Sequence, residues 1–221
     1  MRNWISLIWQ ATWDTLLPPR CLGCDATRSP ENWEEMPPLS RLFCDPCQPT
    51  IEGAEPVVPL GPLARLHVPY AYGGQLAEAI MTFKYHDRAE MAWPLASLWH
   101  PLRAQLRGFD LVVPVPLHRQ RLRRRGYNQA ALLARALRLG PPVATHLLLR
   151  KRSTPPQATL SASERRSALQ GAFDTRRPLG GRVLLVDDVT TTGATLATCA
   201  QALLHAGAER VEGIALAHTQ R

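Results

Sequence analysis

The sequence predicts an α/β domain, in which helices cover both faces of a parallel sheet, with a small zinc-binding module in front of it. Apolar, β-prone segments alternate with helical segments from residue 66 onward, as they do in parallel sheets. One of these segments, residues 183–186, is aliphatic throughout, which is typical of a strand buried on both faces. Two Cys-x-x-Cys pairs lie in the first 50 residues and indicate the metal-binding module.

The composition is that of a globular protein with a basic surface. The chain has 221 residues, enough for one large core and a small appended module. No run approaches the roughly 20 apolar residues that a membrane-spanning helix needs, so we expect no stable membrane insertion. A net charge of +8 favours polyanionic or phosphate-rich partners. A basic surface without a specific partner is the alternative.

An apolar stripe at helical spacing runs through residues 4–17. No small-residue cleavage site precedes Pro18, so we expect no signal peptide and a cytoplasmic protein. The stripe most simply packs on its own protein. The alternative is a helix that lies peripherally on the inner face of the membrane or docks to a partner, which would suit three exposed tryptophans, Trp4, Trp9 and Trp13.

The two cysteine pairs, Cys21 with Cys24 and Cys44 with Cys47, predict a zinc site. Each pair can form a tight knuckle, and together they let four thiolates converge tetrahedrally on one Zn²⁺ ion. Two disulfides are the alternative, but without a secretion signal we expect a reducing compartment, where paired thiols more often bind metal. A closed four-cysteine shell leaves no position for a substrate, so the zinc is expected to be structural.

Recurring prolines in residues 48–62 indicate a linker that ends this module. We therefore expect two domains, residues 1–60 with the N-terminal helix and the zinc module, and residues 61–221 with the α/β sheet. The sheet domain is expected to begin with a strand at 66–72 and a helix from about Gln75. Periodicity then predicts helical residues 89–107, a strand at 111–116, a helix at 129–138, a short strand at 147–149, a capped helix at 161–169 and a last strand at 211–217.

Two basic features accompany these elements. Lys84 lies at the end of the first helix, where a lone lysine is usually a solvated surface charge. A run of arginines follows the strand at 111–116, and mutual repulsion is expected to keep it mobile until an anion binds. Solvation of the run is the alternative, but the sequel Gly126-Tyr127-Asn128-Gln129 adds a hinge, a stacking ring and two amides. We therefore interpret this segment as a ligand-binding arm, referred to below as the arginine arm. Its residues are Arg119, Arg121, Arg123, Arg124, Arg125 and Tyr127.

The buried strand at 183–186 leads directly into an acidic and hydroxyl-rich turn. Asp187 and Asp188 are followed by three threonines and Gly193, and from Thr195 apolar residues recur at helical spacing. Amides at a helix N-terminus attract phosphate, while flanking carboxylates can hold sugar hydroxyls or Mg²⁺. In a parallel sheet this turn lies at the carboxyl edge of the strands, where ligands bind. The turn therefore predicts a phosphorylated sugar as ligand.

This turn resembles the phosphoribosyl pyrophosphate (PRPP) signature of type I phosphoribosyltransferases. The strand, the acidic pair, Thr192-Gly193 and Thr195 all match in one register. The resemblance implies that Asp187 and Asp188 bind the ribose hydroxyls and help to orient magnesium-bound PRPP. It also implies that the 5′-phosphate is wrapped by Thr190, Thr191, Thr192, Gly193, Ala194 and Thr195.

Taken as a whole, the chain resembles the ComF family, which joins a four-cysteine zinc module to a phosphoribosyltransferase-like domain. The resemblance implies a role in natural competence, where the family supports the uptake of transforming single-stranded DNA into the cytoplasm, and enterobacterial relatives are linked to the use of DNA as a nutrient. It rests on both cysteine pairs, Phe83-Lys84-Tyr85, Pro114-Val115-Pro116, Arg125-Gly126-Tyr127-Asn128-Gln129, Gln157 with Arg165, Gly171-Ala172-Phe173 and the PRPP signature.

The family resemblance leaves three hypotheses for function. The first is a PRPP-binding competence protein that handles single-stranded DNA through the arginine arm. The second is an active phosphoribosyltransferase with an unknown acceptor, in which Asp187 and Asp188 are the catalytic candidates and Lys84 and Arg125 contact the pyrophosphate. Thr191, which replaces the aspartate of purine-salvage relatives, and the lack of a recognisable hood argue against turnover. The third is an adaptor for a DNA-uptake motor or helicase.

Overall fold

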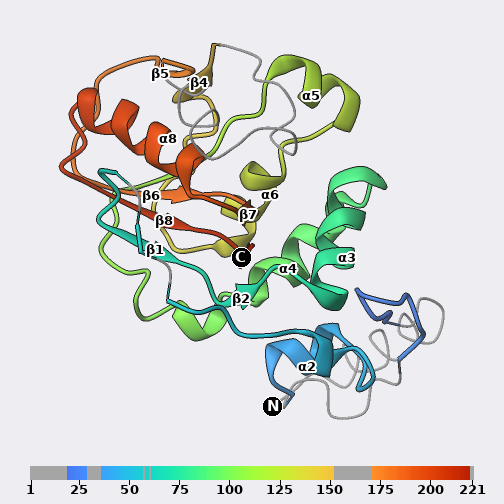
Figure 1. Ribbon diagram of the computed structural model, residues 1–221. Coiled ribbons are helices and arrows are strands. Elements are labelled where there is room, and N and C mark those ends of the chain that lie inside the picture. Colours follow the sequence, from blue (N-terminus) through green and yellow to red (C-terminus); the bar gives the residue numbers. More distant parts are fainter. Residues whose placement is uncertain (1–18, 29–35, 57, 60, 152–170, 220–221) are drawn as a thin grey trace, which may run out of the picture.

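The computed structural model describes residues 19–28, 36–56, 58–59, 61–151 and 171–219, and its centre is a parallel sheet (Figure 1). Four strands lie in the order β1-β8-β6-β3, and every neighbouring pair is parallel. The predicted fold class is therefore confirmed. The strands are β1 (Arg65–His67), β3 (Leu111–Pro114), β6 (Arg182–Val186) and β8 (Arg210–Ile214).

Three of these strands are followed, after a short break, by a second strand segment. The segments pair in the order β2-β9-β7 and are again parallel. The strand expected at 66–72 is interrupted at Pro69, which has no amide hydrogen to donate. The break after β6 contains the acidic pair 187–188. The three segments are β2 (Tyr70–Ala71), β7 (Val189–Thr190) and β9 (Ala217–His218).

Helices cover both faces of the sheet, as the aliphatic strand predicted. Val183 and Leu185 of β6 face α8 (Ala194–His205), whereas Leu184 and Val186 belong to the cluster on the opposite face. These four aliphatic side chains of β6 are fully buried. The opposite face is covered by α3 (Gly74–Tyr85), α4 (Ala92–Ser97) and α6 (Gln129–Leu137).

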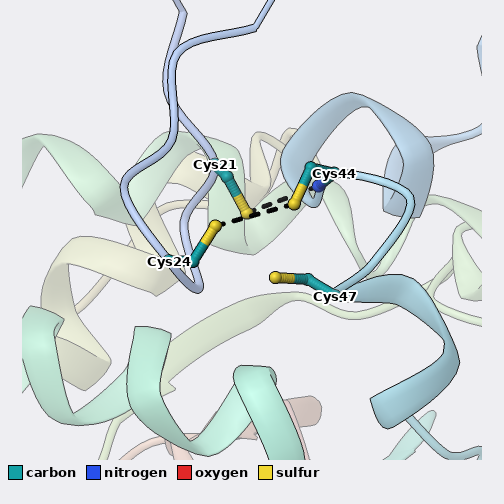
Figure 2. A group of neighbouring side chains, drawn as sticks. All are labelled: Cys21, Cys24, Cys44 and Cys47. Carbon is teal, nitrogen blue, oxygen red and sulfur yellow. Dashed lines mark hydrogen bonds between the residues drawn. The ribbon is translucent and has the colours of Figure 1, made fainter.

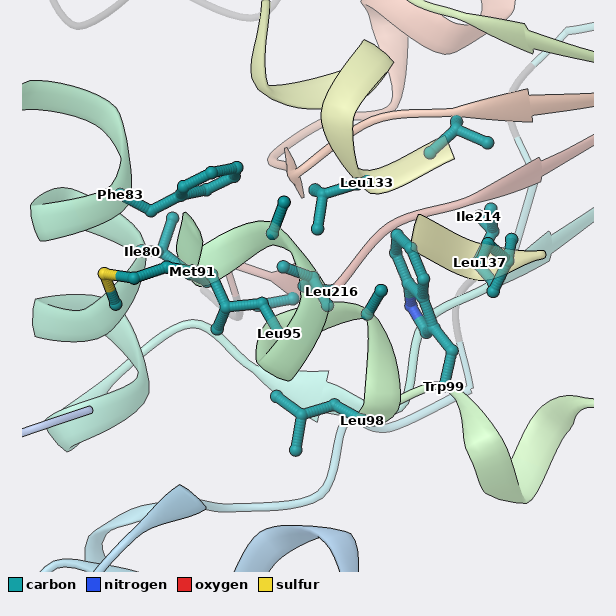
Figure 3. Close-up of a cluster of buried hydrophobic side chains, with 14 of the residues drawn as sticks. Ile80, Phe83, Met91, Leu95, Leu98, Trp99, Leu133, Leu137, Ile214 and Leu216 are labelled. Atoms are coloured by element: carbon teal, nitrogen blue, oxygen red, sulfur yellow. The ribbon is translucent and has the colours of Figure 1, made fainter. Parts of the chain in front are cut away.

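The cluster around α3, α4 and α6 is the larger part of the core (Figure 3). Trp99 is fully buried there, and its Nε1 donates a hydrogen bond of 3.0 Å to the carbonyl oxygen of Ala215, between β8 and β9. The indole thus ties this helical layer to the break in the sheet. The labelled cluster comprises Ile80, Phe83, Met91, Leu95, Leu98, Trp99, Leu133, Leu137, Ile214 and Leu216.

Residues 89–107 form short helical pieces in place of the broadly helical stretch expected from the sequence. They are the 3₁₀ turn η2 (Ala89–Met91), helix α4 and the 3₁₀ turn η3 (His100–Leu102). Pro94 lies in the first turn of α4 and Pro101 within η3. Because proline lacks an amide donor and clashes with the preceding turn, it favours helix starts and prevents one continuous helix.

The arginine run folds into a helix, α5 (Arg119–Arg125), which the sequence did not predict. His118 caps its start, with Nδ1 accepting a hydrogen bond from the amide of Gln120, and Gly126 ends it with a φ of 81°. Because successive side chains of a helix point in different directions around its axis, the five guanidinium groups are spread apart, and this lowers the repulsion between them.

Two further strands between α6 and β6 form an antiparallel pair. Strand β4 (Leu148–Arg150) pairs antiparallel with β5 (Phe173–Thr175), and β5 was not predicted from the sequence. The predicted helix at 161–169 and the apolar stripe at 4–17 lie outside the described residues. In the part of the chain that the structure describes, every helix is too short or too polar to cross a membrane.

The N-terminal module packs directly on the sheet domain. It contains α2 (Pro38–Leu42) and the 3₁₀ turn η1 (Gln48–Thr50). Leu42 and Phe43 are buried in the same cluster as α3 and α4. The boundary expected at residues 60–61 stays a prediction, but this shared cluster gives the two parts one continuous apolar core.

Candidate functional site

The acidic pair occupies the break between β6 and β7, at the carboxyl edge of the four-stranded sheet. The amide of Asp187 donates to Ile214, and the carbonyl of Asp188 accepts from Leu216, both at 2.9 Å. Each carboxylate also accepts a nearby amide: Asp187 Oδ1 from Asp188 at 2.9 Å, and Asp188 Oδ1 from Val189 at 2.7 Å. The backbone of the acidic pair is therefore held to the neighbouring strand segment, and each carboxylate is oriented by the amide of the residue after it.

Lys84 reaches this pair from the last turn of α3. Its Nζ lies 3.1 Å from Asp188 Oδ2, and the side chains are 16% and 11% exposed. Burial alone would lower the pKa of the ammonium, but the Asp188 carboxylate and, beyond it, Asp187 raise it above its ordinary value. Lys84 therefore stays a cation at the site, and the alternative of a solvated surface lysine is wrong.

Asp187 has the opposite electrostatic situation. Burial and the neighbouring Asp188 carboxylate raise the pKa of Asp187 to about 8, against the partial compensation of the Asp188 amide and Lys84. In the free protein Asp187 is therefore poised to hold a proton near neutral pH. Hydroxyl groups and cations brought by a ligand would favour its charged form.

Asp187→Asn is expected to raise the melting temperature, with a gain that grows between about pH 5 and about pH 8. The unfolded chain releases this proton near the ordinary aspartate pKa of about 4, whereas the folded protein holds it until about pH 8. The folded state binds more protons in this window, so its stability falls as pH rises. Because one pKa unit corresponds to about 1.4 kcal/mol, even a quarter of the shift would move the melting temperature by about 3–6 °C. Thermal unfolding at both pH values measures the gain, and an equal gain at both would contradict a raised pKa.

The hydroxyl-rich turn connects the acidic pair to α8. Gly193 lies at the N-cap of α8 with a φ of 74°, a left-handed conformation that favours glycine, and it presents no side chain over the helix start. Thr192 Oγ1 accepts a hydrogen bond of 3.4 Å from the amide of Ala194. Thr190 is buried and Thr191 is exposed. The turn thus offers hydroxyls and helix N-terminal amides, a combination that suits a phosphate group.

Arg125 lies beside the end of α3. Its Nη1 donates a hydrogen bond of 2.7 Å to Gln129 Oε1, and its guanidinium carbon stands 4.7 Å from the centre of the Tyr85 ring. Tyr85 follows Lys84 directly, so the arm and the lysine meet at one helix end. Along α5, Arg119, Arg123 and Arg124 are exposed, whereas Arg121 and Arg125 are half-buried.

The two tyrosines near the arm have different environments. The hydroxyl of Tyr127 donates to the carbonyl oxygen of Phe83, and the centres of the Tyr127 and Phe83 rings are 5.8 Å apart. The Tyr127 side chain therefore links the arginine arm to α3. Tyr85, by contrast, is 55% exposed. Tyr85 is therefore the more accessible ring for stacking, a residue that the sequence reasoning did not select although it adjoins Lys84.

Asn128 and Arg150 add two further contributions. Asn128 caps α6, with Oδ1 accepting a hydrogen bond from the amide of Ala130 at 3.1 Å, while its Nδ2 donates to the carbonyl oxygen of Val115 after β3 at 3.0 Å.

Arg150 of β4 was not selected from the sequence. Its half-buried guanidinium lies over the Phe173 ring, and burial together with the charge of Arg121 lowers its pKa while Asp187 raises it. Arg150 thus lies within electrostatic range of both the arm and the acidic turn.

The four cysteines come together in the N-terminal module, as the spacing predicted (Figure 2). Their sulfur atoms all lie within 4.8 Å of one another, and those of Cys24 and Cys44 are hydrogen-bonded at 3.6 Å. The amide of Cys44 donates to Cys21 Sγ at 3.3 Å. Such amide-to-sulfur bonds stabilise thiolates, the form that binds metal.

This donor set fits a metal ion. Although burial opposes ionisation, backbone amides of Cys24, Cys44 and Gly23 lower the pKa of Cys21 to about 6. Burial and the other three sulfurs raise the pKa of Cys47, so a bound cation would be needed to hold all four thiolates together. Four convergent thiolates are the donor set typical of a closed tetrahedral zinc site.

Comparison with known proteins agrees with this arrangement. A family model described as a phosphoribosyl transferase domain matches residues 122–221. DNA utilization protein YhgH of Escherichia coli strain K12 is 37% identical over 167 residues, which cover 72% of this chain and 74% of that protein. Competence protein F of Haemophilus influenzae is 40% identical over 114 residues, 49% of this chain and 50% of that protein. The chain belongs to the ComF family. Competence protein ComFC of Bacillus subtilis is 32% identical over 143 residues, 62% of this chain and 57% of that protein.

Within this ComF chain, the site draws on more than the matched transferase region. That region begins inside α5 and contains the acidic turn and α8. Lys84, which contacts the acidic pair, and the four cysteines both precede it. Helix α3, which carries Lys84, therefore contributes a residue to the candidate site from outside the matched region.

Proposed function

We propose that this ComF-family chain binds PRPP together with Mg²⁺ at the acidic turn and supports the handling of single-stranded DNA. The contact between Lys84 and Asp188, 3.1 Å long and next to the hydroxyl-rich start of α8, carries the proposal. It joins a retained cation to two carboxylates and a phosphate-binding turn, which matches the parts of PRPP. The names of the relatives, DNA utilization protein and competence protein, support the DNA role.

The residues take complementary roles in this proposal. Asp187 and Asp188 accept hydrogen bonds from the ribose hydroxyls, and the turn from Thr190 to Thr195 holds the 5′-phosphate. Lys84 and Arg125 face the pyrophosphate. Bound Mg²⁺ neutralises phosphate oxygens and helps to position the ligand.

Calorimetry with PRPP and Mg²⁺ tests this ligand assignment. We expect saturable binding that weakens when ribose 5-phosphate or pyrophosphate is titrated instead, because each keeps only part of the contacts. Equal affinity for pyrophosphate alone would show a general anion site and would overturn the ribose assignment.

Turnover is a second candidate, favoured by the raised pKa of Lys84, since a retained cation can offset charge on departing pyrophosphate. Thr191 stands where purine-salvage relatives carry an aspartate base. We therefore propose PRPP binding as the main function and catalysis as the second candidate. Release of pyrophosphate in the presence of bases, nucleotides and single-stranded DNA separates an enzyme from a binding protein. Saturable PRPP binding without release for any acceptor would favour the binding protein.

For the DNA role, Arg123→Ala with Arg124→Ala is expected to weaken single-stranded DNA binding several-fold at low salt. Both side chains are exposed on α5, the helix whose last residue, Arg125, lies over the exposed ring of Tyr85. Removal of one arginine–phosphate interaction should reduce the slope of log affinity against log salt by about 0.7. Fluorescence anisotropy at several salt concentrations measures this slope. Arg176→Ala with Arg177→Ala removes the same charge from another exposed pair and is the control; an equal loss of affinity in both variants would contradict a specific arm.

We further propose that the four cysteines bind one structural Zn²⁺. Reduced cysteines bind metal most readily in a reducing compartment, so a cytoplasmic location, where entering single strands arrive, accompanies this proposal. A DNA-uptake motor, helicase or other competence protein is the partner expected to dock on the module. Copurification with and without residues 1–60 tests that partner role.

A further inference from the structure

We propose that the four-cysteine module sets the position of Lys84 in the candidate PRPP site, and that it does so through helix α3 with Thr50 as the positioning residue. The function of Lys84 rests on the proposed PRPP binding, but its contact with Asp188 does not. The chain of contacts runs from the cysteine knuckles to the first turn of α3, along the helix, and from its last turn to the acidic pair.

The first link is a hydrogen-bonded bridge made by one hydroxyl. Thr50 Oγ1 donates to the carbonyl oxygen of Cys47 at 2.7 Å and accepts from the amide of Gln75 at 3.0 Å. Gln75 lies in the first turn of α3, whose amides have no partner within the helix. Gly73, the N-cap residue, has no side chain to cap them. The second cysteine knuckle therefore supplies a cap that the helix lacks.

The second link is close steric contact between both knuckles and the same helix turn. A Cβ atom on Gly74, which has a φ of +50°, would lie 2.0 Å from the carbonyl oxygen of Thr50. A Cβ atom on Gly23, in the first knuckle, would lie 2.7 Å from Gln75 Cβ. Glycine at both positions lets the module touch the helix start without a gap, so a displacement of the knuckles must displace the helix.

The third link is the helix itself. α3 has 12 residues, about 18 Å at 1.5 Å per residue, and Leu76, Ile80 and Phe83 on one side are fully buried. Phe43 of the module is buried in the same cluster. Lys84 stands in the last turn and contacts Asp188. Metal binding, which fixes the knuckles, is thereby coupled to the ion pair at the other end of α3.

The two lysines of the chain make this coupling measurable without any ligand. Both lysines form ion pairs, but Lys84 is only 16% exposed, whereas Lys151 is 59% exposed and serves as an internal reference. Acylating reagents attack the neutral amine, so burial and a raised pKa protect Lys84. Mass spectrometry after brief acetylation gives the ratio of modification at Lys84 to that at Lys151 in the full chain.

We expect this ratio to rise about tenfold when zinc is chelated, the change that corresponds to weakening a charge-assisted hydrogen bond by about 1.4 kcal/mol. Thr50→Val keeps the size of the side chain but removes the bridge, so it should raise the ratio several-fold while zinc content stays at one per chain. Thr50→Ser restores the hydroxyl and should restore the ratio. Ser97→Ala, which removes a hydroxyl bond of 2.7 Å within α4, is the matched control and should leave it unchanged.

Two results would overturn the proposal: an unchanged ratio in Thr50→Val with zinc retained, or equal effects of Thr50→Val and Ser97→Ala. If chelation unfolds the protein, as circular dichroism would show, the zinc-loaded Thr50→Val variant decides the question. Calorimetry with PRPP on the same samples separates the two proposals. Absence of PRPP binding in the unmodified protein would refute the proposed ligand, while the acetylation ratio would still report the coupling.

Discussion

Lys84→Met is expected to lower PRPP affinity at least about 30-fold and to lower the melting temperature as well. The substitution removes the cation proposed to face the pyrophosphate and leaves the Asp188 side chain, only 11% exposed, next to Asp187 without its partner. Removing one member of a buried, hydrogen-bonded charge pair costs about 2–5 kcal/mol, which in a binding equilibrium is about 30-fold to several thousand-fold. Calorimetry and thermal unfolding measure the two effects.

Lys151→Met is the matched control for this prediction. Lys151 also forms an ion pair, with Asp174 at 2.5 Å, but both side chains are at least half exposed. Exposed pairs contribute about 0–1 kcal/mol, so little change in either measurement is expected. If Lys84→Met bound PRPP as tightly as Lys151→Met, Lys84 would have no part in ligand binding. A normal melting temperature would contradict the buried contact.

Cys47→Ser is expected to abolish stoichiometric zinc binding and to lower the melting temperature by about 10 °C or more. Cys47 is 5% exposed, and the segment between the cysteine pairs contributes Leu42 and Phe43 to the main core. Structural zinc contributes about 10–16 kcal/mol in small peptides, and the loss of about 3 kcal/mol already corresponds to about 6–12 °C in a chain of this size. Metal analysis and thermal unfolding of the same samples test both effects.

Cys199→Ala distinguishes metal binding from a general effect of cysteine replacement. Cys199 is fully buried on α8, among the residues that face β6, and lies outside the four-cysteine group. The variant should lose some stability through a small cavity but keep one zinc per chain. Zinc retained in Cys47→Ser, or lost in Cys199→Ala, would contradict the assignment of the ligands.

Contiguous motifs were predicted well because each is short enough to carry its own physical signature. Residues 183–186 are all aliphatic, so side chains on both faces of the strand are apolar. This pattern is typical of a strand that is covered on both faces, and the acidic turn follows this strand directly. The cysteine pairs likewise carry their geometry in their spacing. The structure confirms the buried strand, helix α8 and the cysteine group.

Local charge and ring patterns were poorer guides. The arginine run formed a helix because His118 and Gly126 supply caps at its two ends. The hydroxyl of Tyr127 donates to the carbonyl oxygen of Phe83, and stacking of its half-buried ring on a ligand stays a prediction, whereas the ring of Tyr85 is exposed. An isolated polar residue can satisfy its hydrogen bonds inside the protein or outside it, and sequence alone does not distinguish these outcomes.

By itself, the sequence determined the parallel α/β class, the acidic turn after a buried strand and the four-cysteine group, since each depends on residues close together in the chain. Only the tertiary structure decided that Lys84 meets Asp188, that Thr50 caps α3, and that the metal module shares a core with the sheet. These contacts join residues far apart in the chain, and their formation depends on how α3 packs between the module and the sheet. The acidic turn predicts a phosphorylated ligand, and α3 places beside it the cation that completes the site.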